Sequence, residues 1–152
     1  MTDGLEHLFP ALRSANYQVT SPRDVSYNCI AWAADDFGNW WWPSNPAVSY
    51  WPPQVPREGT LENFIRAFQM LGYQPCEDGR PEDGFEKVAI YMDSSNTPSH
   101  MARQLPSGHW TSKLGDLEDI QHETLDQLEG RDPAYGNAKQ FLKRRRQQPL
   151  DV

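Results

Sequence analysis

The sequence predicts an α+β domain, in which a short helix beginning near a cysteine and a longer amphipathic helix precede an antiparallel sheet. Three observations lead to this prediction. Polar residues precede Cys29 and small and apolar residues follow it, within a predicted helix over 26–35. A single apolar stripe at helical spacing runs over 61–71, and strand-forming segments separated by turns fill 85–122. At this length we expect one domain, 1–152.

Short elements alternate with turns in the N-terminal part of the chain. Residues 1–16 are predicted to form an arm, because Pro10 limits any helix there. A short strand over 17–20 leads through turn residues to the cysteine helix. Residues 39–59 form a long connection, since their prolines exclude a regular helix or a central strand.

The helix over 61–71 has the strongest signals. Thr60 is a favourable N-cap, and Gly72 suits the position just after the helix. The apolar residues lie three and four positions apart, as expected for one buried face: Leu61, Phe64, Ile65, Phe68 and Leu71. We interpret this stripe as core.

Strands and turns follow that helix. An extended piece over 73–76 precedes a strand over 85–92, which is rich in β-branched and aromatic residues and is expected to be central. The remaining predicted elements are strands over 100–105 and 109–113, an extended segment over 119–122, a short helix over 124–128 and a last helix over 135–146.

Charge and composition argue against several classes of function. The formal net charge of −7 argues against a nucleic-acid partner and suits a basic protein partner. The sequence contains no apolar stretch of membrane-spanning length and no signal-peptide pattern at its N-terminus. We therefore expect a cytoplasmic protein without a membrane partner, with export by a signal-independent route left open. Two cysteines and scattered histidines give no zinc pattern, so neither a metal nor another cofactor is expected.

Cys29 stands where a nucleophilic thiol is expected. A helix N-terminus carries a partial positive charge and N–H groups without helical partners, and so stabilises a thiolate or an oxyanion beside it. Asn28 and the backbone N–H of Cys29 are the predicted oxyanion donors. Alternatively, Cys29 is a small buried side chain, which is common for cysteine. Cys76 lies in a predicted loop and is interpreted as structural.

A cysteine nucleophile also needs an imidazole that takes its proton, and a third group that orients this imidazole. Of the four histidines, His100 opens a predicted strand just after a polar turn, from which its ring would project towards the cysteine helix. Taken alone, His100 would be interpreted as a hydrogen-bonded histidine at a strand end. Beside Cys29, the base is the favoured interpretation.

These stretches resemble papain-like thiol hydrolases, including the cell-wall amidase branch known as NlpC/P60. Tyr-Asn-Cys-Ile-Ala-Trp-Ala at 27–33 is similar to the cysteine helix of that family, and His-Met-Ala-Arg-Gln at 100–104 is similar to its histidine-led strand. Trp-Thr-Ser-Lys-Leu-Gly at 110–115 looks like the next strand, which carries the orienting residue. The resemblance covers residues 25–122. It implies a papain-like core over 17–130, followed by a C-terminal helix and basic tail over 131–152.

The orienting residue departs from the family pattern. In papain-like enzymes it is usually His, Asn, Asp, Glu or Gln, whereas the strand here offers Thr111 or Ser112. A hydroxyl can accept from an imidazole N–H, but it stabilises imidazolium less than a carboxylate does. We predict Ser112 by position, with Asp119 and His122 as rivals.

The resemblance to papain-like enzymes implies a hydrolase or transferase of the cysteine peptidase or amidase class, deamidases included. Its substrate would be an amide or peptide-type bond in a peptide, a protein or a peptidoglycan-like stem. The chain also resembles an uncharacterised group of bacterial proteins with Asn-Cys, Trp-Trp-Trp-Pro, Ser-Lys-Leu-Gly and Glu-Asp-Ile-x-His motifs. The alternative is a catalytically inactive papain-like domain that serves as a protein-binding or immunity module.

The aromatic residues of the long connection have two interpretations. Trp40, Trp41, Trp42 and Trp51 are predicted to wall a cleft beside Cys29 and bind a substrate by stacking. Alternatively, they fold inward and cover the sheet. Consecutive tryptophans cannot all face one way, so we expect a split, with at least half of them turned inward.

Overall fold

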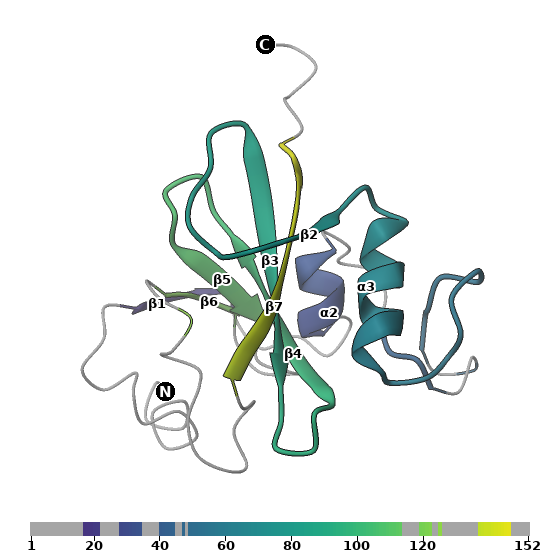
Figure 1. The fold of residues 1–152 in the computed structure, drawn as a ribbon. Coiled ribbons are helices and arrows are strands. Elements are labelled where there is room, and N and C mark those ends of the chain that lie inside the picture. Colours follow the sequence, from purple (N-terminus) through teal and green to yellow (C-terminus); the bar gives the residue numbers. More distant parts are fainter. Residues whose placement is uncertain are drawn as a thin grey trace, which may run out of the picture.

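A computed structural model describes residues 17–21, 28–34, 40–44, 47, 49–113, 119–122, 125 and 137–146. These residues form an α+β fold with two helices beside one sheet, as the sequence predicts (Figure 1). The elements are β1 Tyr17–Ser21, α2 Cys29–Ala33, α3 Leu61–Gln69, β2 Gln74–Cys76, β3 Phe85–Met92, β4 Pro98–Gln104, β5 Trp110–Lys113, β6 Asp119–His122 and β7 Asn137–Arg145. The predicted arm over 1–16, and all of the predicted helix over 124–128 except Leu125, lie outside the described residues.

The sheet has seven strands in the order β1-β6-β5-β4-β3-β7-β2, and its described pairings are antiparallel. From β3 to β6 the chain forms a meander, in which each strand pairs with the next. The bounds of β3 and β6 agree with the predicted strands over 85–92 and 119–122. Because β7 returns to the other side of β3, β3 lies in the interior of the sheet, as its apolar composition indicates.

The predicted C-terminal helix over 135–146 is wrong, because its described part is the strand β7. β7 pairs along its length with β3 and, near its end, with β2. Its basic residues reach carboxylates outside it: Lys143 Nζ lies 2.8 Å from Glu82 Oε2, and Arg144 Nε lies 2.6 Å from Glu86 Oε2. Backbone pairing with strands distant in sequence overrides the local helical spacing.

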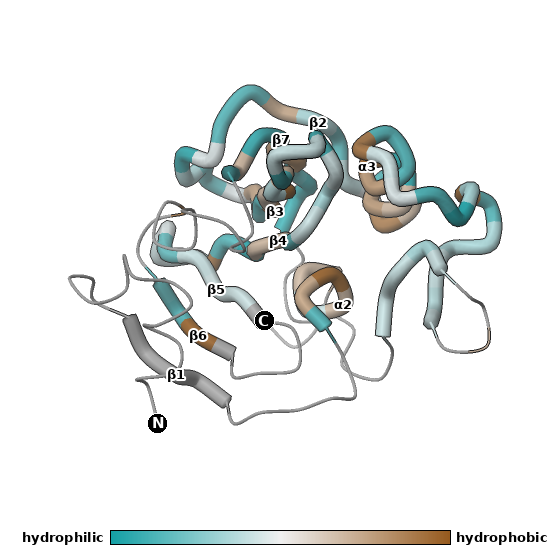
Figure 2. Tube along the Cα trace, turned by 90° about the horizontal axis from the view of Figure 1, so that it is seen from below, coloured by the Kyte–Doolittle hydropathy of each residue, from teal (hydrophilic) through white to brown (hydrophobic). Residues whose placement is uncertain are grey.

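One face of the sheet packs against the helices and the aromatic connection. α2 packs on β4 and β5, and Figure 2 shows brown, hydrophobic stretches in both α2 and α3, with hydrophilic residues between them in α3. The buried core on this side combines residues from both helices, the connection and three strands, among them Ile30, Trp51, Phe68, Ile90 and Met101. Within the described part of the chain, no helix is both long and apolar enough to cross a membrane.

The helix α3 begins as predicted and ends two residues earlier, at Gln69. The Thr60 hydroxyl caps it by accepting from the backbone N–H of Asn63 at 3.2 Å. Its Phe64 and Phe68 side chains are fully buried. Gly72 has a φ of 96°, a left-handed conformation that glycine adopts without the strain of a Cβ, as expected after a helix C-terminus.

Candidate functional site

Cys29 is the first residue of α2, and only 5% of its surface is exposed. The helix has five residues, fewer than the predicted 26–35, of which the described part is 28–34. It lies over β4 and β5, which carry His100 and Ser112. The fold thus brings the cysteine helix next to the two strands on which the sequence places the base and the orienting residue.

Asn28 organises the start of this helix. Its Oδ1 accepts from the backbone N–H of Ala31 at 3.1 Å and from that of Trp41 at 3.2 Å. Its Nδ2 donates to the Trp41 carbonyl at 2.7 Å. The predicted oxyanion donor is therefore engaged in capping α2 and fastening the aromatic connection to it.

Replacing Asn28 with alanine is expected to lower the free energy of unfolding by about 2–3 kcal/mol. The change removes a helix cap and leaves two buried backbone groups of Trp41 without their partner. Asn28→Asp is the matched control, because a carboxylate keeps the acceptor and loses only the donor. In urea denaturation, the free energy of unfolding should be highest for wild type, lower for Asn28→Asp and lowest for Asn28→Ala. An alanine variant as stable as wild type would contradict the role of Asn28 in holding α2 and the aromatic connection together.

A buried polar cluster lies on three neighbouring strands. Nε2 of His100, on β4, lies 3.1 Å from Oγ of Ser112, on β5. The same Oγ lies 2.9 Å from Nε2 of His122, on β6. All three residues are 0% exposed. Of the proposed orienting residues, Ser112 contacts His100 directly and His122 stands behind Ser112, while the Asp119 side chain lies outside the described part of the chain.

Strand alternation separates Ser112 from Thr111, the other residue considered at this strand. The Thr111 hydroxyl accepts from Trp32 Nε1 at 3.2 Å, so Thr111 faces α2. Ser112, as the next residue, faces the opposite side. The same rule applies on β4, where Met101 packs in the core with Cys29 and His100 points the other way. The His–Ser–His cluster and α2 therefore belong to opposite faces of the sheet.

On one side β3 pairs with β4 at His100, through Tyr91. β4 pairs with β5 through Arg103 and Gln104, both at the C-terminal end of β4. His100 lies on the N-terminal side of this paired stretch.

Tyr91 is a member of the cluster that the sequence analysis did not single out. It is the register partner of His100 on β3, and its ring meets the imidazole edge-on at a centroid distance of 5.0 Å. Its hydroxyl donates to the Leu125 carbonyl at 2.7 Å. The register of the β3–β4 hairpin is the signal that predicts this neighbour.

Burial lowers the pKa of His100 well below its usual value, and the nearby His122 lowers it further. The folded state thus resists a proton that the unfolded chain accepts below pH about 6.5. Stability should be intact above that pH and decrease as the pH falls through it.

We expect the free energy of unfolding to fall by about 1 kcal/mol between pH 7 and pH 5.5 on account of His100 alone. Urea denaturation of wild type and His100→Gln at several pH values measures this contribution as the difference between their slopes. His109→Gln is the control, because His109 is partly exposed and bonded to Gln121 instead. Equal slopes for wild type and His100→Gln would contradict the assignment.

The tryptophans divide between core and surface, as expected. Trp41 and Trp51 are 4% and 2% exposed, so their rings fill the core and offer no face to a substrate. Trp51 packs on Phe64 at a centroid distance of 5.1 Å, and its Nε1 donates to the Pro56 carbonyl at 3.0 Å. Only Trp40 and Trp42, which are half-buried, remain as substrate-binding candidates.

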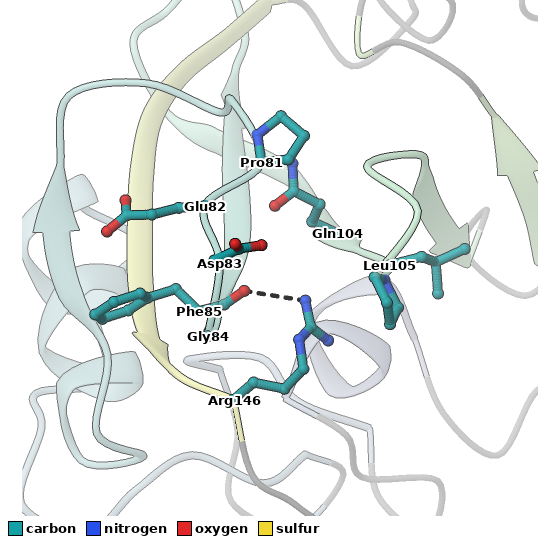
Figure 3. A pocket seen from close by; sticks show the side chains of 9 residues that line it. Pro81, Glu82, Asp83, Gly84, Phe85, Gln104, Leu105 and Arg146 are labelled. Carbon is teal, nitrogen blue, oxygen red and sulfur yellow. Dashed lines mark hydrogen bonds between the residues drawn. The ribbon is translucent and has the colours of Figure 1, made fainter.

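A pocket of about 190 Å³ lies apart from the predicted catalytic residues (Figure 3). Its lining comes from residues 81–85, Gln104 to Pro106 and Arg146. The Arg146 guanidinium donates to the Phe85 carbonyl at 3.0 Å, and this bond engages the one cationic side chain in the lining. Nor do the described residues contain a group of three or more His, Cys, Asp or Glu side chains arranged to hold a metal ion.

Cys76 is the last residue of β2, and not part of a loop as predicted. It is half-buried on β2, its Sγ lies 3.5 Å from the Asp78 carbonyl, and burial raises its pKa. Neither Cys29 nor Cys76 is part of a disulfide.

Fold and site together define an α+β domain with a capped cysteine helix on one face of its sheet and a buried His–Ser–His cluster on the other. The chain belongs to the family described as a domain of unknown function, DUF7689, whose model matches residues 18–143. Neither the curated proteins nor the solved structures yield a match.

Proposed function

We propose that this protein is a thiol-dependent hydrolase or transferase that acts on amide or peptide-type bonds. The observation that carries the proposal is the contact between His100 Nε2 and Ser112 Oγ. It holds the imidazole through one ring nitrogen, as the base of a catalytic triad is held. Cys29 is the first residue of α2, where a helix N-terminus favours a thiolate.

In this proposal the Cys29 thiol transfers its proton to Nδ1 of His100, and the thiolate sulfur adds to the substrate carbonyl carbon. The backbone N–H of Cys29 stabilises the oxyanion, since the Asn28 amide is engaged with Trp41. The imidazolium returns the proton to the leaving amine as the C–N bond breaks. Water or an acceptor amine then releases the acyl group from the thioester. Because Cys29 and His100 lie on opposite faces of the sheet, the mechanism requires the imidazole to reach the thiol past an end of β4.

The experiment compares turnover of glutamine-containing peptides, isopeptides and peptidoglycan stem peptides by wild type, Cys29→Ala and Cys76→Ala. We expect Cys29→Ala to abolish release of ammonia or amine, and Cys76→Ala to retain it. Turnover that survives in Cys29→Ala would overturn the proposal.

A catalytically inactive, protein-binding module is the second candidate. The burial of Cys29 and His100 and their placement on opposite faces of the sheet favour it. With a net charge of −7, the natural partner would be a basic protein. Calorimetric titration with lysozyme as a basic probe, at low and high salt, should then give salt-sensitive binding that is the same in wild type and Cys29→Ala. The absence of binding at low salt would count against this module.

A further inference from the structure

Ser112 shares one hydroxyl between two imidazole rings. Its Oγ lies 3.1 Å from Nε2 of His100 and 2.9 Å from Nε2 of His122. A hydroxyl has one proton to donate and accepts through its lone pairs. When both rings are neutral, it can therefore donate to one of them while it accepts from the other.

Any other hydrogen-bonding arrangement of Ser112 would leave a buried polar group without a partner. Ser112 and both histidines are fully buried, and the cross-strand partner of Ser112 on β6 is the apolar Ile120. If both rings donated to Oγ, the serine proton would need a third acceptor in this apolar setting. If neither donated, one ring nitrogen would face the oxygen without a proton between them. While both rings are neutral, the two histidines are thus driven into opposite tautomers.

We propose that His122 is a positioning residue that acts through Ser112 to hold His100 in its Nε2–H tautomer. In this state His100 Nε2–H donates to Ser112, and the Ser112 hydroxyl donates to the bare Nε2 of His122. His100 Nδ1 then has no proton and accepts the one from Cys29. The direction of this chain rests on the proposed function, whereas the opposite tautomers of the two rings rest on the geometry alone.

If the hydrogen bonds between His122, Ser112 and His100 run in the opposite direction, His100 cannot act as the base. If His122 carries its proton on Nε2, Ser112 accepts from it and donates to Nε2 of His100. His100 then carries its own proton on Nδ1, where the thiol needs an acceptor. The ring of Tyr91 packs edge-on against the His100 ring at a centroid distance of 5.0 Å. This contact holds the ring in place whichever of its nitrogens carries the proton.

The first experiment reads the tautomers directly. Two-bond ¹⁵N–¹H spectra of the full chain at pH 7.5, assigned with single His→Gln variants, should show His100 protonated on Nε2 and His122 protonated on Nδ1. His100 protonated on Nδ1, or the same tautomer in both rings, would overturn the inference. This measurement needs no substrate.

The second experiment compares His122→Gln with His122→Leu. Glutamine can accept from Ser112 and cannot be protonated, so it should preserve the His100 tautomer and the rate of Cys29 alkylation. Leucine offers no acceptor, so His100 should move to the Nδ1–H tautomer and Cys29 alkylation should slow by about 10-fold or more. In a Ser112→Ala background, Gln and Leu at this position should give the same rate. A difference between them that survives there would assign His122 a merely structural role.

The two proposals fail separately. Opposite tautomers in a protein that shows no Cys29-dependent turnover would support the coupling between the two histidines and contradict the proposed enzymatic function. Cys29-dependent turnover, together with a His100 tautomer that is unchanged in His122→Leu, would support the enzymatic function and contradict the coupling.

Discussion

Replacement of His100 by glutamine is expected to slow alkylation of Cys29 about 100-fold at pH 7.5, with no change at Cys76. The imidazole makes the thiolate available by accepting the thiol proton, and glutamine cannot do so. The two thiols lie in one molecule, so iodoacetamide labelling followed by peptide mass spectrometry compares them in the same sample. Cys76, whose pKa is raised by burial, gives the reference rate of alkylation for a thiol that has no neighbouring base.

Destabilisation cannot imitate this result. Cys29 is 5% exposed, so a variant that opens more often would label faster at this position. His109→Gln is the matched control, because it removes an imidazole on the same sheet that lies outside the His–Ser–His cluster. A His100→Gln rate equal to that of His109→Gln would show that Cys29 does not use His100, and would favour the binding module.

Phe64→Ala is expected to lower the free energy of unfolding by about 3–5 kcal/mol, a loss typical of a large buried ring. Phe64 is 0% exposed and links α3 to the aromatic connection. Its ring lies 5.1 Å from that of Trp51 and 5.7 Å from that of Trp42. The variant removes this shared contact and leaves a cavity between the helix and the connection.

Met70→Ala provides the comparison for Phe64, because Met70 directly follows α3 and is 53% exposed. Its replacement should change stability by less than about 0.5 kcal/mol. Thermal or urea unfolding measures both variants, and tryptophan fluorescence reports the connection itself. A small loss for Phe64→Ala would mean that the tryptophans are held by something other than this ring.

Local pattern was sufficient for several elements and insufficient for others. The apolar stripe from Leu61 onward, with Thr60 and Gly72 at its ends, identifies α3, because caps and periodicity lie within one short segment. The composition of residues 85–92 likewise marks a central strand. β7 was missed, because its spacing also fits a helix and only pairing with the distant β3 decides the matter.

The same division applies to the candidate site. Cys29 and His100 could be named from residue type and order along the chain, and Ser112, with Asp119 and His122 as rivals, from the resemblance to papain-like enzymes. Their distances could not, since these depend on register: the β5–β6 pairing puts His122 behind Ser112, and the β3–β4 pairing puts Tyr91 against His100. Asn28 was interpreted as an oxyanion donor because nothing local reveals its bonds to Trp41, thirteen residues later.

By itself, the sequence determined the α+β class, the helix α3 over most of its predicted length and the central strand β3. It also supplied the polar residues from which the candidate site is assembled. Periodicity, capping and residue chemistry are local properties, so they can be read without a fold. The tertiary structure alone decided that residues 137–145 are a strand, that Trp41 and Trp51 are core, and that one serine hydroxyl joins two histidines. Each of these depends on contacts between segments far apart in the chain, and long-range pairing and burial decide such contacts where local preference does not.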